Sequence, residues 1–146
     1  MVSRKGDGRV RRGKAGEEAA QALLERSGYR IIDANVRFGA KSGLIGELDI
    51  VAWEGSTLCF VEVKSRTGTV GRVHPGEAVT PAKQRQIAQL ALAYTARAGL
   101  LKDEGDGIDL RFDVVTVVLA PAGEGETAVV VRSARLWRGA FLAEAD

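Results

Sequence analysis

Residues 47–66 read ELDIVAWEGSTLCFVEVKSR, and this stretch predicts a β-hairpin with charged residues at its open end. Two alternating apolar and polar stretches flank Gly55-Ser56, a pair suited to a tight two-residue turn. In that register the numbers of facing residues sum to 111, so Asp49 lies opposite Glu62. Because side chains alternate along a strand, the two carboxylates share one face of the hairpin.

Carboxylates that face each other across a strand pair repel, since their Cβ atoms are about 5 Å apart. A divalent cation that prefers oxygen ligands would relieve this repulsion. Lys64 lies on the same face as Glu62, because the two are separated by one residue. Glu47 faces Lys64 in this register, which favours a role in orienting the lysine over a role as a metal ligand.

Metal-assisted cleavage of a phosphodiester needs carboxylates that hold the ion and a cation close to the reacting phosphate. The ion activates water and neutralises phosphate charge, and a lysine can orient or deprotonate the water or stabilise the transition state. Asp49, Glu62 and Lys64 meet these needs at one end of the hairpin. The alternative is an exposed strand face with an ordinary Glu–Lys pair, since a Glu-x-Lys triplet alone is common.

Length and composition indicate a single globular domain. The chain has 146 residues, of which 45% are hydrophobic, enough for one core. Cys59 is its one cysteine, so no internal disulfide or zinc cluster is expected and a reducing compartment is favoured. We expect no secretory signal and no membrane span, because no apolar run is long enough, and therefore a cytoplasmic protein.

The first fourteen residues are strongly basic and contain three glycines. They predict a flexible arm over residues 1–13, which suits a polyanion such as DNA; a solubilising tail is the alternative. The cations of this segment are Arg4, Lys5, Arg9, Arg11, Arg12 and Lys14, of which we take Arg11 and Arg12 as candidate contacts to nucleic acid.

The rest of the chain predicts the order helix, three strands, helix, two strands. This order is typical of a mixed sheet flanked by helices, an α/β fold. Thr80-Pro81 is a favourable start for the second helix, and Gly99 is a favourable end. Glu17 falls beside the buried stripe of the first helix. The helices are expected at 15–27 and 80–99, and the strands at 29–37, on either side of Gly55-Ser56, at 110–119 and at 128–132, with 136–141 either docking or fraying.

Several stretches in this order resemble the YraN-type family of uncharacterised bacterial proteins. The resemblance covers roughly residues 13–118 and is carried by Gly16-Glu17-Glu18-x-Ala20, Gly28-Tyr29-x-Ile31-x-x-x-Asn35-x-Arg37, Gly46-Glu47-Leu48-Asp49-Ile50-Val51-Ala52, Phe60-Val61-Glu62-Val63-Lys64-x-Arg66, Lys83, Tyr94 and Arg111-Phe112-Asp113-Val114.

That family is similar to the PD-(D/E)xK nucleases, whose relatives include archaeal Holliday-junction resolvases. The resemblance implies a restriction-endonuclease-like fold over residues 14–141, followed by a short tail at 142–146. It implies Asp49, Glu62 and Lys64 as the signature triad, with Glu17 as a further acidic residue at the metal. The loop at 38–45 is longer than is usual for the family, and a surface insertion is favoured over a gate or a DNA contact.

Other polar residues have competing interpretations. Arg66, Lys83 and Arg85 are candidate phosphate contacts, but each also fits a solvated surface. His74 is expected at the surface rather than as a catalytic base, and Asp113 is expected to be structural.

The sequence therefore predicts a Mg²⁺- or Mn²⁺-dependent DNA endonuclease. The rivals are a binding module without turnover and an interaction subunit of a DNA-processing assembly. Cutting of branched DNA usually needs two active sites, so a homodimer is a further expectation.

Overall fold

The computed structural model describes residues 4–68, 79–100, 107–125 and 128–142; side chains are described from Gly13 onward. The elements are α1 (Arg4–Arg26), β1 (Arg30–Arg37), the 3₁₀ turn η1 (Ala40–Ser42), β2 (Glu47–Glu54), β3 (Thr57–Thr67), α3 (Pro81–Arg97), β4 (Asp109–Pro121) and β5 (Val129–Phe141). This confirms the predicted order of helices and strands.

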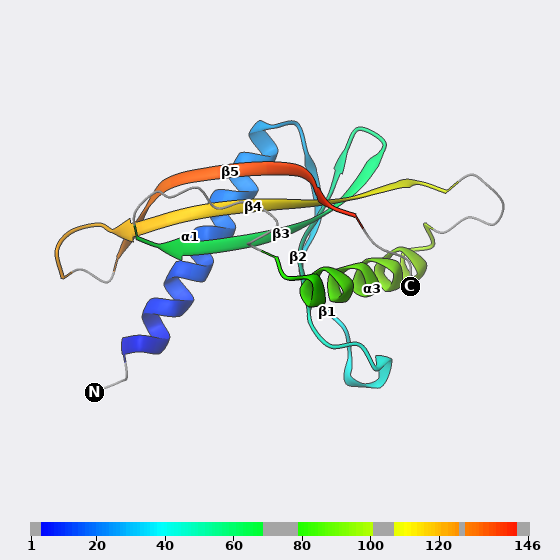
Figure 1. Ribbon diagram of the computed structural model, residues 1–146, viewed down its shortest axis with the longest axis horizontal. Coiled ribbons are helices and arrows are strands. Elements are labelled where there is room, and N and C mark those ends of the chain that lie inside the picture. The colour runs from blue at the N-terminus through cyan, green and yellow to red at the C-terminus, as the bar shows by residue number, and fades with distance from the viewer. Residues whose placement is uncertain (1–3, 69–78, 101–106, 126–127, 143–146) are drawn as a thin grey trace.

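The strands form one mixed sheet in the order β1-β2-β3-β4-β5 (Figure 1). All neighbours are antiparallel except β3 and β4, which are parallel and are connected through α3. A parallel pair needs such a crossover, because a short turn can only join antiparallel strands.

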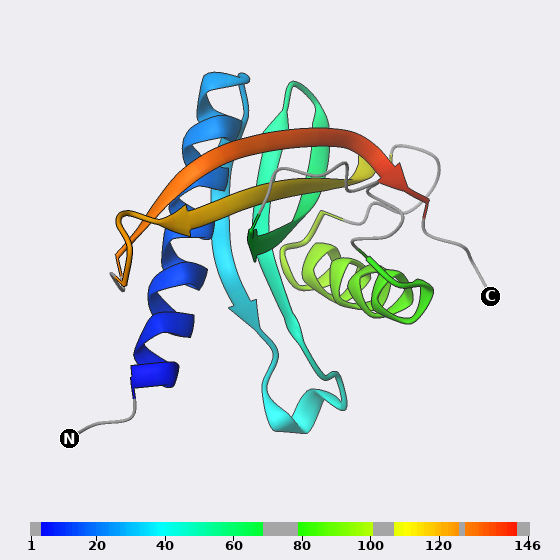
Figure 2. The same ribbon diagram turned by 60° about the vertical axis from the view of Figure 1, so that its left-hand side comes forward.

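The two helices cover opposite faces of the sheet (Figure 2). Ala20 and Leu24 of α1 pack with residues such as Val61 and Val115 on one face. Ile87 and Leu90 of α3 belong to the second core, on the other face. Each face therefore buries an apolar layer, which fixes the sheet between the helices.

The β2–β3 hairpin has the predicted register. Glu54 pairs with Thr57 and Ile50 pairs with Val61, so the facing numbers sum to 111. The second helix also has the predicted ends: the Thr80 hydroxyl accepts a hydrogen bond from the Lys83 N–H, and Gly99 has a φ of +70°.

Two boundaries differ from the predictions. Helix α1 begins at Arg4 instead of residue 15, so the backbone of residues 4–13, within the predicted arm, is helical. Arg and Lys are good helix formers, and extending a helix that tertiary contacts already hold costs little. Strand β5 continues to Phe141 because that ring docks, stacking on Phe112 with 5.0 Å between centroids.

Two predicted loops fall wholly or mainly outside the described residues. They are the Gly-rich loop that contains His74 and the acidic loop after Gly99. Within the part of the chain that the structure describes, no helix is long and apolar enough to cross a membrane.

Candidate metal centre

Asp49 and Glu62 come together where β2 and β3 stop pairing. The paired register of the two strands ends at Ile50 and Val61, one residue before this pair. Beyond that point the Asp49 carboxylate reaches across and accepts a hydrogen bond from the Val63 N–H at 2.9 Å. The carboxylate is thus held by the backbone of the neighbouring strand and does not depend on a mobile side chain.

Burial and mutual repulsion raise the pKa of both carboxyl groups. Glu62 is only 6% exposed. Burial, followed by the charge of Asp49, raises the pKa of Glu62 to about 7. Burial also raises the pKa of Asp49, against the hydrogen bonds from Val63 and from Glu62. Glu62 therefore keeps its proton to a higher pH than an ordinary glutamate does.

Two lysines flank Glu62. The ammonium of Lys64 lies 3.8 Å from Glu62 Oε1, and the ammonium of Lys83, in the first turn of α3, lies 4.0 Å from the same oxygen. The predicted triad is therefore assembled at one place. The sequence predicts Lys83 as a phosphate contact or a solvated surface residue, and the structure brings it to the same carboxylate.

Asp49 also belongs to a second group of carboxylates, together with Glu17 and Glu47. Ligand oxygens of Glu17, Glu47 and Asp49 all lie within 4.8 Å of one another. Glu17 comes from α1, which passes close to β3 because Gly16 has no side chain: a Cβ atom there would overlap the Ser65 hydroxyl. Burial is the main cause that raises the pKa of Glu17, and the charges of Asp49 and Glu47 add to it.

Glu47 does not have the partner that the hairpin register predicted. Its carboxylate accepts a hydrogen bond from Arg37 Nε at 2.8 Å, and the expected pairing with Lys64 is wrong. The reason is that β2 and β3 no longer pair beyond Ile50, so the register cannot be extended to residue 47. Glu47 thus belongs to the carboxylate group, as a candidate ligand.

Asn35 links the carboxylates of two elements and was not assigned a role from the sequence. With its amide nitrogen turned toward them, it donates to Glu17 at 2.6 Å and to Glu47 at 3.0 Å. Its φ is +52°, a left-handed conformation within β1 that asparagine tolerates better than most residues. In the β1–β2 register Ala34 faces Ile50 and Val36 faces Leu48, so Asn35 lies opposite Asp49. This pairing is the signal that could have identified Asn35 as part of the site.

The remaining candidates are exposed or cannot be placed. Arg66 is exposed near the end of β3, and Arg85 is exposed on α3. The side chains of Arg11 and Arg12 lie outside the described part of the molecule.

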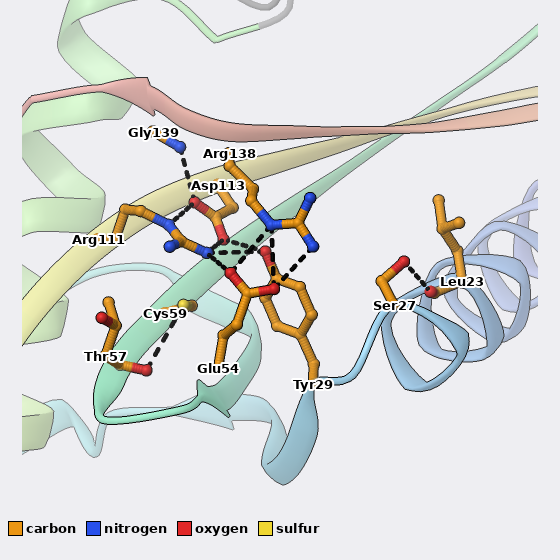
Figure 3. Close-up of polar contacts among 10 residues, drawn as sticks. All are labelled: Leu23, Ser27, Tyr29, Glu54, Thr57, Cys59, Arg111, Asp113, Arg138 and Gly139. Atoms are coloured by element: carbon orange, nitrogen blue, oxygen red, sulfur yellow. Dashed lines mark hydrogen bonds and ion pairs between the residues drawn. The ribbon is translucent and has the colours of Figure 1, made fainter.

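A separate polar cluster, drawn in Figure 3, includes Glu54, which ends β2 at the opposite end from Glu47. Asp113 is fully buried and accepts hydrogen bonds from the Tyr29 hydroxyl, Arg111 and the Gly139 N–H. Arg111 also bonds Glu54, which is clamped by Arg138. Every polar atom of Asp113 is thus used within the fold, which agrees with the structural role predicted for it.

Cys59 is also a core residue. Its side chain is fully buried, and burial raises the pKa of its thiol to about 12. The thiol is therefore unreactive at neutral pH, as expected for a small buried hydrophobe.

The donor set of the carboxylate group consists of oxygen atoms only. Hard cations such as Mg²⁺ and Mn²⁺ prefer such ligands, whereas softer metals favour sulfur and nitrogen. The residues present therefore fit the metal that the sequence suggested.

The model of the uncharacterised protein family UPF0102 matches residues 16–117. A UPF0102 protein of Symbiobacterium thermophilum is 50% identical over 111 residues, which are 76% of this chain and 85% of the relative. A UPF0102 protein of Geobacter sulfurreducens is 49% identical over 110 residues, 75% of this chain and 77% of the relative. The matched region contains all the carboxylates described above.

Proposed function

The chain belongs to the uncharacterised protein family UPF0102, and from its site we propose that it is a Mg²⁺- or Mn²⁺-dependent DNA endonuclease. In this proposal the sheet and its two helices form a restriction-endonuclease-like domain of the PD-(D/E)xK type. The observation that carries the proposal is the anchored Asp49 next to a buried Glu62 with two lysines around it. A purely structural ion pair would not need a second buried carboxylate at the same point.

Each side chain has a defined task in this proposal. Asp49 and Glu62 hold the metal ion, and Glu17 and Glu47 add carboxylate oxygens on the side of α1. When bound, the ion activates water for attack and neutralises charge on the phosphate. Lys64 lies beside Glu62 with its side chain 42% exposed, so its ammonium can reach both the attacking water and a phosphate oxygen.

The overall reaction is hydrolysis. A water oxygen forms a bond to phosphorus, the bond from phosphorus to the leaving oxygen breaks, and that oxygen leaves with a proton. No redox partner or organic cofactor is required. The lysines supply positive charge where the phosphate becomes more negative in the transition state.

A cleavage assay on the purified full chain tests this proposal. The wild type is expected to nick plasmid or branched DNA with Mg²⁺ or Mn²⁺, and Asp49→Asn, Glu62→Gln and Lys64→Ala are each expected to lose activity by at least about a hundredfold. Glu18→Gln is the matched control, because Glu18 is the exposed neighbour of Glu17. Equal cleavage by all four variants would show that the activity lies elsewhere.

Thermal melts give a second readout that does not depend on turnover. Mn²⁺ at ten times its dissociation constant should stabilise the wild type by about 1.4 kcal/mol, and Asp49→Asn should lose most of this gain. Without metal the Asn variant should be as stable as the wild type or more so, because one repelling charge is gone and an amide oxygen can still accept from Val63. The same Mn²⁺ gain in both proteins would place the metal at another site.

A further inference from the structure

The sheet face that carries Glu62 continues beyond the metal centre as a polar row across three strands. Lys64 of β3 pairs with Thr116 of β4, and Thr116 pairs with Arg135 of β5. Directly paired residues lie on the same face, so the row runs from the candidate site to β5, the edge strand. With neighbouring strands about 4.8 Å apart, the row is roughly 10 Å long.

The neighbouring row on this face ends in a tryptophan that positions Arg135. Glu62 pairs with Val114, and Val114 pairs with Trp137. The indole Nε1 of Trp137 donates to the Thr116 hydroxyl at 3.2 Å, and the Arg135 guanidinium lies 4.0 Å from the centre of the indole ring. Stacking holds the planar guanidinium in place while its N–H groups, at the rim of the plane, can still donate.

The charges of this region suit an anionic partner. Lys64 and Arg135 are both at least partly open to solvent, and the ammonium of Lys83 reaches Glu62 from α3. The opposite face of the same strands is covered by α1, whose Ala19 packs there with apolar residues such as Val115. A long anion could thus approach Glu62 along the row, on the face of these strands that α1 does not cover.

We infer that Lys64, Thr116, Arg135 and Trp137 form a phosphate-binding strip that carries the DNA backbone from the β5 edge to the metal centre. Arg135, held on Trp137, is the phosphate clamp of this strip. The inference rests on the proposed function, because it gives the path of the strand that the carboxylates would cut. The strip contacts phosphates, so it should bind DNA without regard to base sequence.

The test is duplex binding measured by fluorescence anisotropy at several salt concentrations, with EDTA present so that no cleavage occurs. Arg135→Gln is expected to make the plot of log affinity against log salt shallower by about 0.9, the share of one phosphate contact. If the variant and the wild type bind equally at 1 M salt, where these contacts are screened, the variant should bind about eightfold more weakly than the wild type at 0.1 M salt. The control is Arg26→Gln, which removes the same charge from an exposed position on α1 and should leave the slope unchanged.

Arg135→Lys separates charge from stacking. It should restore most of the salt slope but only part of the affinity, because lysine keeps the charge and loses the planar stacking. The inference would be overturned if the salt plot of Arg135→Gln coincided with that of the wild type. It would also be overturned if the wild type bound no duplex. A wild type that binds DNA through this strip but cuts nothing with Mg²⁺ or Mn²⁺ would instead overturn the nuclease proposal and leave the strip in place.

Discussion

At the scale of single residues, the pKa of Glu62 makes the stability of the metal-free protein depend on pH. Its pKa is raised from an ordinary 4.5 to about 7 in the folded protein. Between these two values the folded state holds a proton that the unfolded state has released. The free energy of unfolding should therefore fall as the pH rises from about 4.5 to about 7 and then level off.

Urea denaturation in EDTA at pH 5 and pH 8 measures this effect. Glu62→Gln removes the titrating group and should reduce the loss of stability between the two pH values. Asp49 and Glu17 also have raised pKa values, so a smaller loss in the same direction should remain. If the variant lost as much stability as the wild type, the buried carboxyl of Glu62 would not be the source.

At the scale of elements, Gly16 sets how closely α1 approaches the sheet and thereby where Glu17 lies. A Cβ at Gly16 would overlap the Ser65 hydroxyl, whereas a Cβ at Gly13, on the same helix, would meet nothing within 4 Å. Gly16→Ala makes the same gain in helix propensity as Gly13→Ala, but overpacking against Ser65 should cost about 1–3 kcal/mol, so the variant should be less stable than Gly13→Ala by about that amount. Gly13→Ala, the matched control, should stabilise by about 1 kcal/mol, since alanine is the better helix former.

A compensating change at Ser65 tests whether the contact itself is responsible. Ser65→Gly removes both the hydroxyl and the Cβ atom that faces Gly16, so the double variant should regain most of the stability lost by Gly16→Ala. Chemical denaturation of the four proteins gives the coupling energy. Additive effects of the two substitutions would show that the helix does not touch β3 at this point.

The elements also show how far a sequence can predict this site. The Gly55-Ser56 turn fixes the hairpin register, so the meeting of Asp49 and Glu62 could be derived from local chemistry. The partner of Glu47 could not, because it depends on where β2 and β3 separate and on Arg37 of another strand. The same holds for Asn35, whose role comes from the pairing of β1 with β2 and from a left-handed φ that no local pattern indicates.

Boundaries of elements were harder to predict than their existence. Three glycines in the first fourteen residues suggested a flexible arm, yet α1 begins at Arg4, since the helix continues from the part that packs on the sheet. The extension of β5 to Phe141 likewise depends on the tertiary contact of that ring with Phe112. At β5 a tertiary contact decided between local preferences, whereas the start of α1 continues a helix that packs on the sheet only further along the chain.

At the scale of the whole molecule, the first turns of α1 extend past the strands, away from the two cores (Figures 1 and 2). This segment contains five cations against Asp7 within residues 1–12: Arg4, Lys5, Arg9, Arg11 and Arg12. A helical extension with this composition gives the molecule a second basic region, in addition to the strip that ends at Arg135. We expect it to add phosphate contacts without taking part in the chemistry.

Deleting residues 1–12 should weaken DNA binding at low salt and make the salt slope shallower by about two to four units, because each contacted phosphate contributes about 0.9. A full-length variant with the five cations changed to glutamine keeps good helix formers, so it separates loss of charge from loss of the helix. Preference for base sequence should not change in either protein, and cleavage at saturating DNA should survive, since Glu17, Asp49, Glu62 and Lys64 remain. If the three proteins have the same salt slope, the segment has a solubilising role. If only the deletion has a shallower slope, the helix and not its charge makes the contact.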